Sequence, residues 1–461
     1  MAWRLVGWRL LALALLTGGP ASAQNEWVAE EPSPPCPSNS TDPLKRPRPD
    51  YDGRGPEPEG CEALIWIPRA LLAPLYLVEE YALRQPVGAG ATYAEQHPLP
   101  KWVTSLFRFG PNDEGGIFPT FFFDFNVRPS VGLHFFWNNF LATGNRISAD
   151  AAYGGTQWVT LAVGDIYNFS PTESLSGQVR WNRRPDSLYY GIGSSTTNTY
   201  ESRVGSDVIL GIVTYKTLVA KRLELETTAT IKRTVYQPYS CCGDPSMQQR
   251  VEAGQLPPPP GYLLNYTATS VNVRAVYDTR PPRPEPQSGF RATLALRPGL
   301  DVGQGIDGTW LRYGAQLEGF WDVTGKARVL SLGITALFAD PLGSSLLPFT
   351  EYISLGGVEP FVGFNPGRLL DRSALVAQLG WHWPVFAYVD GVASVSFGNV
   401  FDAHLQNFSF SLLRLGAELG LRTTGTGSST FELVFGVGTE TFQNGLQLTG
   451  FRFAFGVVYG L

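Results

Sequence analysis

Apolar and polar side chains alternate along one segment of the chain after another, and this two-residue period constrains the fold most. Residues 223–231, 290–296, 413–421, 431–437 and 451–459 each place aliphatic or aromatic side chains at every second position. The positions between them are mostly charged, hydroxyl-bearing or small. Successive side chains of a strand point to opposite faces, so this period predicts strands with one apolar face and an all-β chain.

A soluble β-sandwich has the same period, but three features favour strands that cross a membrane. The apolar faces run over about 9–11 residues, the length of a tilted membrane strand. The opposite faces carry charges of both signs, as in a water-filled lumen. Aromatic residues gather at the ends of the segments, as in the girdles of membrane barrels: Tyr189, Tyr190, Trp310, Trp321, Trp381 and Trp383. Because backbone groups in lipid must all be paired, we expect a closed antiparallel transmembrane β-barrel.

Alternation and turn residues predict about 16 strands, an even number as in bacterial barrels. Their centres are expected near residues 122, 135, 149, 161, 176, 207, 229, 269, 295, 315, 332, 378, 393, 416, 434 and 453. With both termini in the periplasm, three long connections lie outside the cell: 183–199, 236–260 and 339–372. The last of these is too long for an ordinary hairpin, and long loops on a rigid scaffold usually carry function.

The first hundred residues differ from the rest. Residues 1–23 have the basic, apolar and small-residue order of a secretory signal peptide, and the apolar run is too short to span a bilayer as a helix. Residues 24–101 are expected to form a Pro-rich periplasmic segment. A short amphipathic helix is predicted at about 68–84, either packed on the protein or lying at the membrane surface. The barrel then occupies residues 102–461.

Several functional classes are disfavoured. The net charge of −5 gives no basic surface for nucleic acid. The four His are scattered, with no metal-ligand spacing, and no catalytic grouping or phosphate-binding loop is recognisable, so we expect no enzyme and no cofactor. In an exported chain, Cys36 and Cys61 can form a disulfide that closes a loop. Cys241 and Cys242 are adjacent, and free thiols or other pairings remain alternatives to a bridge.

Five segments, in the same order along the chain, resemble motifs of the BamA/TamA-like outer-membrane superfamily, also called bacterial surface antigens. They are residues 189–194 (Tyr-Tyr-Gly-Ile-Gly-Ser), 277–280 with 286–289, 355–364 (Leu-Gly-Gly-Val-Glu-Pro-Phe-Val-Gly-Phe), 381–384 (Trp-His-Trp-Pro) and 397–401 (Phe-Gly-Asn-Val-Phe). The resemblance implies a barrel in which the loop motif reaches the lumen. The motif residues here are Gly356, Gly357, Phe361, Val362, Gly363 and Phe364.

The chain departs from the family pattern at three charged positions. Val362 stands where the family has an Arg, and its acidic wall counterparts are matched here by Gly380 and Ser396. Since an unpartnered buried charge is costly, the whole ion-pair set is expected to be absent together. Phe361 and Phe364 are then expected to anchor the loop. Residues 24–101 also lack the pattern of the family's periplasmic POTRA domains.

The resemblance implies a protein of the bacterial outer membrane that assists insertion or translocation of protein or lipid. The expected partners are outer-membrane lipid and an unfolded outer-membrane protein or a lipid client, with no nucleic acid, and the expected state is a monomer. The alternative is a diverged pore or structural barrel without insertase activity, which the mixed charges of the lumen would also suit.

Overall fold

The structure is a computed structural model that describes residues 105–124, 127–239, 241–280, 288–303, 305–323, 327–357, 360–386, 389–423 and 429–459. The expected signal peptide, the Pro-rich segment at 24–101, its helix at 68–84 and the disulfide between Cys36 and Cys61 lie outside these residues.

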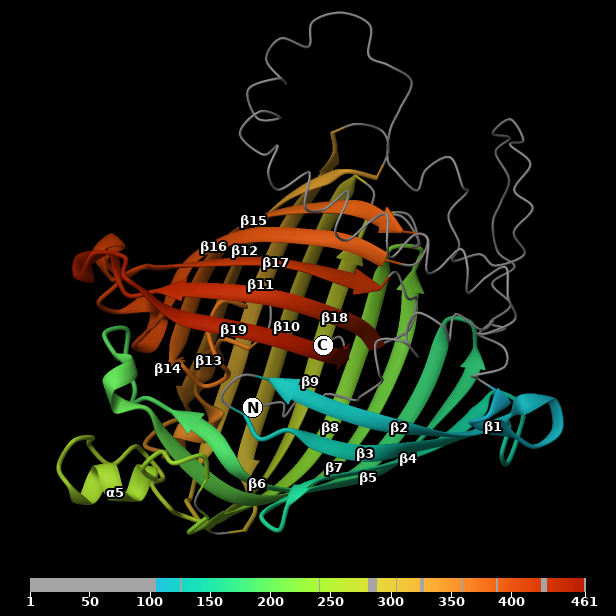
Figure 1. Cartoon of the computed structure of the whole chain (residues 1–461), viewed down its shortest axis with the longest axis horizontal. Helices are drawn as coiled ribbons and strands as arrows, with labels where there is room; N and C mark the ends of the chain where they lie inside the picture. The colour runs from blue at the N-terminus through green and yellow to red at the C-terminus, as the bar shows by residue number, and fades with distance from the viewer. Residues whose placement is uncertain are drawn as a thin grey trace, which may run out of the picture.

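One antiparallel sheet of 17 strands dominates the described residues (Figure 1). Each of the expected strand centres lies within one of its long strands, while the expected number of about 16 stays a prediction. The strands of the sheet are β1 (Arg108–Phe109), β2 (Gly115–Asp124), β3 (Ser130–Asn138), β4 (Asn145–Gly155), β5 (Trp158–Ser170), β6 (Glu173–Tyr189), β7 (Ser202–Ala220), β8 (Leu223–Gln237), β9 (Tyr266–Asp278), β10 (Gly289–Asp301), β11 (Thr309–Asp322), β12 (Val329–Pro341), β15 (Ser373–Phe386), β16 (Val389–Phe401), β17 (Arg414–Thr423), β18 (Ser429–Thr439) and β19 (Leu448–Tyr459).

Short elements decorate the connections. The β8–β9 connection holds α5 (Met247–Glu252), whose first turn is closed by reciprocal hydrogen bonds between Ser246 and Gln249. The β12–β15 connection contains η6 (Phe349–Glu351) and a two-stranded sheet of β13 (Ile353–Leu355) and β14 (Leu369–Asp371). The remaining 3₁₀ turns are η4 (Pro111–Asp113), η5 (Asn198–Tyr200), η7 (Ala403–Leu405), η8 (Phe410–Leu412) and η9 (Phe442–Asn444).

The two faces of the sheet have opposite chemistry. On the convex face large apolar side chains are exposed, for example Val179 at 63%, Leu294 at 60% and Phe451 at 57%. The alternate positions point to the concave face, where Arg291 pairs with Glu318 at 2.6 Å. So extensive an apolar surface is not stable in water and suits contact with lipid. In the part of the chain that the structure describes, no helix is long and apolar enough to cross a membrane.

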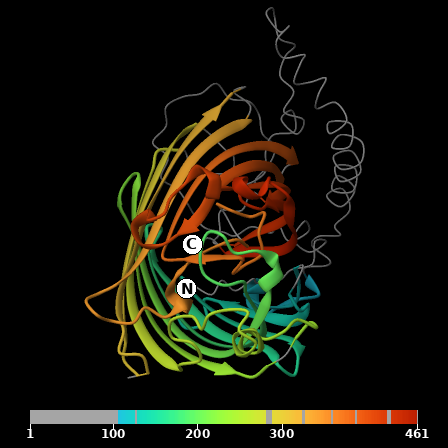
Figure 2. The same ribbon diagram turned by 90° about the vertical axis from the view of Figure 1, so that its left-hand side faces the viewer.

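The β12–β15 connection folds back onto the concave face of the sheet (Figure 2). Its side chains form one buried cluster with inward-facing residues of the sheet, including Tyr189, Tyr266, Trp310, Val376 and Val400. The connection expected as an external loop at 339–372 therefore supplies much of the protein's core.

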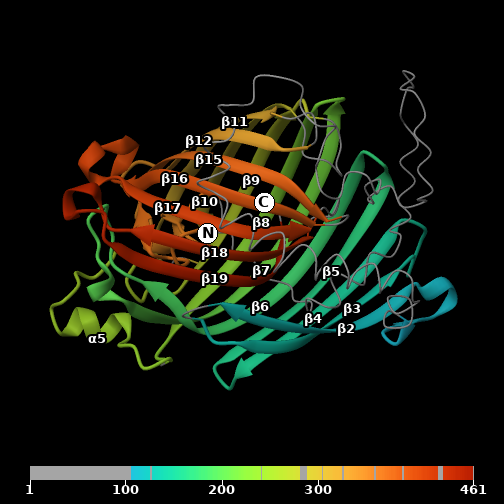
Figure 3. The same cartoon turned by 45° about the horizontal axis from the view of Figure 1, so that its top comes forward.

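The expected complete closure of the barrel is not observed. The sheet curls until β19 and β2 meet (Figure 3), but they share only two residue pairs, Ala454 with Asp124 and Phe455 with Phe123. Pro119 lies in β2 and has no N–H to donate, a feature of edge strands. An all-antiparallel sheet with a short seam replaces the fully paired barrel that the alternation predicts.

Candidate functional site

The β12–β15 connection is held first through η6, on the side of the sheet formed by β8, β9 and β11. Glu351 accepts hydrogen bonds from Lys232 and from the Tyr266 hydroxyl, the latter at 3.1 Å, and its second oxygen lies 3.7 Å from Arg312. Burial raises the pKa of Glu351, but the charges of Lys232, Arg297 and Arg312 together outweigh burial and hold the pKa well below its usual range. The carboxylate therefore stays charged and pins η6 to the wall.

The tip of the connection carries the loop motif. Gly356 and Gly357 have φ of 109° and 79°, a region that favours glycine, and so turn the chain after β13. The Gly357 N–H donates to the Phe364 carbonyl at 2.6 Å and closes the tip. Phe361 is 0% exposed and Phe364 1%, with their ring centroids 4.9 Å apart. The two rings are the apolar anchor of the tip.

The tip lies on a row of small residues that crosses the last four strands. Ser396, Gly416, Gly438 and Gly450 are register partners from β16 to β19, and we call this row the glycine lane. A Cβ added at Gly416 would lie 3.2 Å from the Phe361 ring, and one at Gly450 would lie 2.9 Å from the Gly363 carbonyl. Real Cβ contacts are longer, so the lane has to be made of small residues for the tip to fit.

The wall counterparts predicted for the motif behave differently from each other. Ser396 donates its hydroxyl to the Pro360 carbonyl at 2.7 Å and so contacts the loop directly. Gly380 lies in β15, where the nearest atoms to an added Cβ belong to Ser331 and His382 rather than to the loop. Val362 is 7% exposed. None of these three positions carries a charge.

The connection is nevertheless fastened by buried charge, a few residues beyond the motif. Arg368 donates to Asn198 Oδ1 at 2.6 Å and to the Thr196 hydroxyl and carbonyl at 2.9 and 2.8 Å, and it lies 3.4 Å from Glu440. Arg414 of β17 donates to Glu440 at 2.7 Å and to the Thr196 carbonyl at 2.6 Å. We call this set of five residues the arginine junction.

Burial dominates the electrostatics of the arginine junction. Desolvation, with the neighbouring Arg414 charge, lowers the pKa of Arg368 to about 10, which still leaves it charged at neutral pH. Two guanidinium groups share one carboxylate, and each also donates to a backbone carbonyl, Arg368 to that of Thr196 and Arg414 to that of Ser194. Arginine suits this role because its planar fork satisfies several acceptors at once. No local sequence pattern indicates the arginine junction, because Arg368 lies outside the loop motif and its partners are distant in the sequence.

Three of the five motif segments meet at the loop. Gly193 donates its N–H to the Leu370 carbonyl at 3.0 Å, and the Arg368 guanidinium lies 5.1 Å from the centre of the Tyr190 ring. Asn399 donates to the Ser194 carbonyl at 2.9 Å. The segments at 277–280 and 381–384 lie elsewhere: Asp278 pairs with Arg280 at the β9–β10 turn, and the other segment belongs to β15.

The seam between β19 and β2 is short and is crossed by one buried ion pair. Arg452 lies 3.1 Å from Asp124, and both residues are largely buried. On its other side β19 pairs with β18 at eleven positions, and β2 pairs with β3 at eight. Gly363 of the loop contacts Gly450 of β19, so the tip rests directly on a strand of the seam.

Among the residues that the structure describes, the cysteines and acidic side chains form no metal site. Cys241 and Cys242 are bonded to each other in the β8–β9 connection. Within the described ranges, no three His, Cys, Asp or Glu side chains gather closely enough to hold a metal ion.

The family model for the Omp85 superfamily domain matches residues 139–458, which includes the loop, the glycine lane and the arginine junction. The chain belongs to the Omp85 superfamily. This Omp85 chain is a β-barrel protein of the bacterial outer membrane, in agreement with the resemblance to the BamA/TamA-like superfamily. No curated protein sequence matches the chain.

A solved structure of BamA shares the fold. The crystal structure of BamA from Haemophilus ducreyi lacking POTRA domains 1–3 is 13% identical, with a TM-score of 0.52, over 75% of this chain and 70% of that one. CdiB from Acinetobacter baumannii is 10% identical (TM-score 0.46, 75% and 60% covered), and CdiB from Escherichia coli is 12% identical (0.46, 75% and 63%). At such low identity the BamA match shows the fold alone.

Proposed function

We propose that this Omp85 chain assists insertion or translocation of protein or lipid at the outer membrane, with the client engaging the seam between β19 and β2. The observation that carries the proposal is the seam itself: two residue pairs join strands that pair at eight and eleven positions with their other neighbours. Each unpaired backbone group in lipid costs several kcal/mol, roughly, so a short seam favours an added strand or an opening.

The docked loop supports the same proposal. It contacts β19 through Gly363 and Gly450 and is fastened at the arginine junction and at Glu351, so the interior is occupied while the seam remains weak. This arrangement suits a client that leaves sideways into the membrane better than one that passes straight along the barrel axis.

Depletion of the protein tests the proposal. The outer-membrane proteome and the surface lipids should change when the gene is switched off, and re-expression of the wild-type chain should restore them. An envelope that is unchanged in a clean deletion would refute an assembly or translocation role.

A diverged pore is the second candidate, because paired charges line the concave face away from the loop. Arg291 lies 2.6 Å from Glu318, and Glu226 lies 3.8 Å from Arg274. Planar-bilayer recording separates the candidates. A pore gives conductance steps that grow when residues 342–372 are deleted, whereas the absence of steps in both proteins contradicts a pore.

A further inference from the structure

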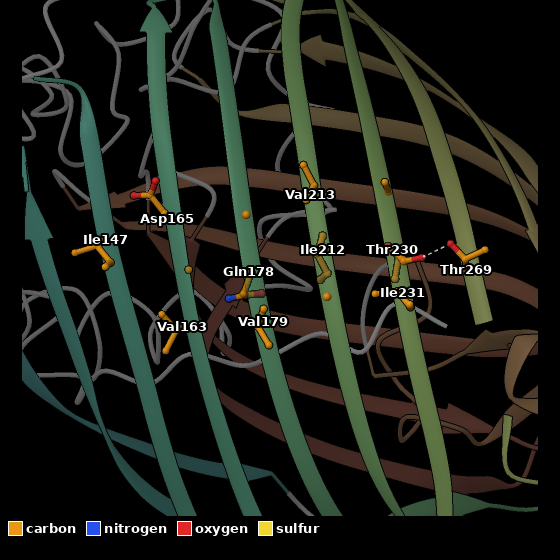
Figure 4. Close-up of a pocket in the computed structure, with 14 residues that line it drawn as sticks. Ile147, Val163, Asp165, Gln178, Val179, Ile212, Val213, Thr230, Ile231 and Thr269 are labelled. Carbon is orange, nitrogen blue, oxygen red and sulfur yellow. Dashed lines mark hydrogen bonds between the residues drawn. The ribbon is translucent and has the colours of Figure 1, made fainter. Parts of the chain in front are cut away.

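The outward face of the sheet has a hollow over β4 to β9 (Figure 4). Its volume is about 580 Å³, within the usual range of small-molecule sites. Branched apolar side chains surround it, including Val163, Val179, Val213 and Ile231, all on the outward face.

The hollow exists because small residues replace larger ones at its centre. Gly177 pairs with Val213 and Gly211 pairs with Val179, so two adjacent strands lack a side chain where their neighbours carry one. A Cβ added at Gly177 would meet no atom within 4 Å. The wall is therefore thinned over an area that the surrounding Val and Ile side chains enclose, which fits an acyl chain lying against the protein.

One charged side chain lines this apolar hollow. Asp165 of β5 points outward beside Gly177, its register partner, and accepts a hydrogen bond from Asn145 Nδ2 at 2.5 Å. Charged groups on the lipid face are destabilising unless a partner or water satisfies them. A carboxylate in this position favours a cationic group in the adjacent lipid layer.

The depth of Asp165 points to a headgroup rather than to the bilayer centre. Tyr167 and Phe169 follow it on the same face, with their ring centroids 5.0 Å apart. Aromatic residues concentrate where the membrane meets water. Asp165 lies two residues away from Tyr167, about 7 Å along the strand at ~3.3 Å per residue, and so within reach of lipid headgroups. The expected topology puts this end of β5 on the periplasmic side.

We propose that this hollow is a binding site for a phospholipid with a primary amine headgroup, such as phosphatidylethanolamine. The acyl chain lies across Gly177 and Gly211, and the ammonium group donates to the Asp165 carboxylate. Among the fourteen residues that line the hollow, Asp165 alone is charged, so the site disfavours anionic headgroups. The site depends on the membrane position of the protein and is independent of any insertase activity.

Native mass spectrometry of the full-length chain tests the site. The protein is taken from nanodiscs that contain equal amounts of phosphatidylethanolamine and phosphatidylglycerol in a phosphatidylcholine background. The wild type should retain the amine lipid over the anionic one by on the order of 3–5-fold, as one partly solvated ion pair allows. Asp165→Asn should lose this preference, because the amide carries no charge.

A second variant tests the hollow separately. Gly177→Leu should lower retention of both lipids, since the new side chain projects into the hollow, where its Cβ meets no atom within 4 Å. Ala377→Leu is the matched control: it makes the same kind of change on the exposed outward face of β15, and its lipid retention should equal that of the wild type. Heat-modifiability on gels reports that each variant is folded. An unchanged lipid ratio in Asp165→Asn, or full retention in Gly177→Leu, would overturn the proposal.

Discussion

Replacement of Gly363 by Ala tests how closely the loop tip fits the sheet. A methyl group at this position would overlap the Val437 carbonyl of β18, which is backbone and has little freedom to move. Gly363 already lies close to Gly436 and Gly450 of the same sheet. The tip therefore has to lift from the glycine lane, and Phe361 and Phe364 lose part of their burial.

The expected cost follows from these contacts. Full exposure of both phenylalanine side chains would cost roughly 3–6 kcal/mol, at about 1.5–3 kcal/mol each. Overpacking that the structure partly absorbs costs about 1–3 kcal/mol. Replacing glycine also lowers the conformational entropy of the undocked loop, which favours docking by only about 0.4–1 kcal/mol. We therefore expect docking to weaken by about 2 kcal/mol, a change of roughly 30-fold in the opening equilibrium.

Hydrogen–deuterium exchange in nanodiscs measures this effect on peptides from residues 353–371. Exchange should rise in Gly363→Ala while the peptides of β8 to β11 stay as protected as in the wild type. Gly177→Ala is the matched control, since the added methyl group meets open space. Wild-type exchange of the tip in a folded Gly363→Ala protein would refute the close fit described for the glycine lane.

Three further predictions concern charged groups. Arg368→Gln breaks a buried pair with Glu440 and should weaken loop docking by about 3–5 kcal/mol, measured by the protease sensitivity of the loop. Lys216→Gln, at the partly exposed pair with Glu224, is the control and should change the free energy of unfolding by less than about 1 kcal/mol, measured by thermal unfolding. Burial raises the pKa of Asp371 to about 6, above its unfolded value of about 3.8, so the docked loop binds the proton more tightly. The docking equilibrium of the loop should therefore strengthen about tenfold from pH 7.5 to pH 5, as measured by hydrogen–deuterium exchange. Asp371→Asn should remove this pH dependence. A loop that exchanges faster on acidification would contradict the assignment to Asp371. Asp124→Asn should speed amide exchange in β19, and unchanged exchange would show that Arg452 does not hold the seam.

The strands were predictable because membrane strands obey a simple rule. Leu294, Leu332 and Phe451 lie on the outward face, as the two-residue alternation predicts. Apolar side chains are favoured on the face toward lipid and polar side chains on the face toward water. Closure was not predictable in the same way. Alternation shows which face a residue takes, but it contains no information on how many residues β19 and β2 share.

The functional site was predictable only at positions where a local sequence motif determines the conformation of the chain. The glycines before the tip require positive φ, and the Phe361 and Phe364 positions follow from the motif, so the sequence located the tip. The arginine junction joins Arg368, Arg414 and Glu440 with residues of the β6–β7 connection, over separations of up to 218 residues. Such contacts depend on the curvature of the sheet, which the sequence pattern does not give.

A reversible lock on the seam tests the central claim most directly. Phe123 and Phe455 are register partners across β2 and β19, at a spacing that a disulfide spans, so Phe123→Cys with Phe455→Cys should join the strands on oxidation. Val437→Cys with Phe451→Cys, within the long β18–β19 ladder, is the matched control. In proteoliposomes, the oxidised seam lock should stop insertion of an unfolded outer-membrane protein or transfer of lipid, reduction should restore it, and the control should stay active. Full activity with the seam locked would contradict the account.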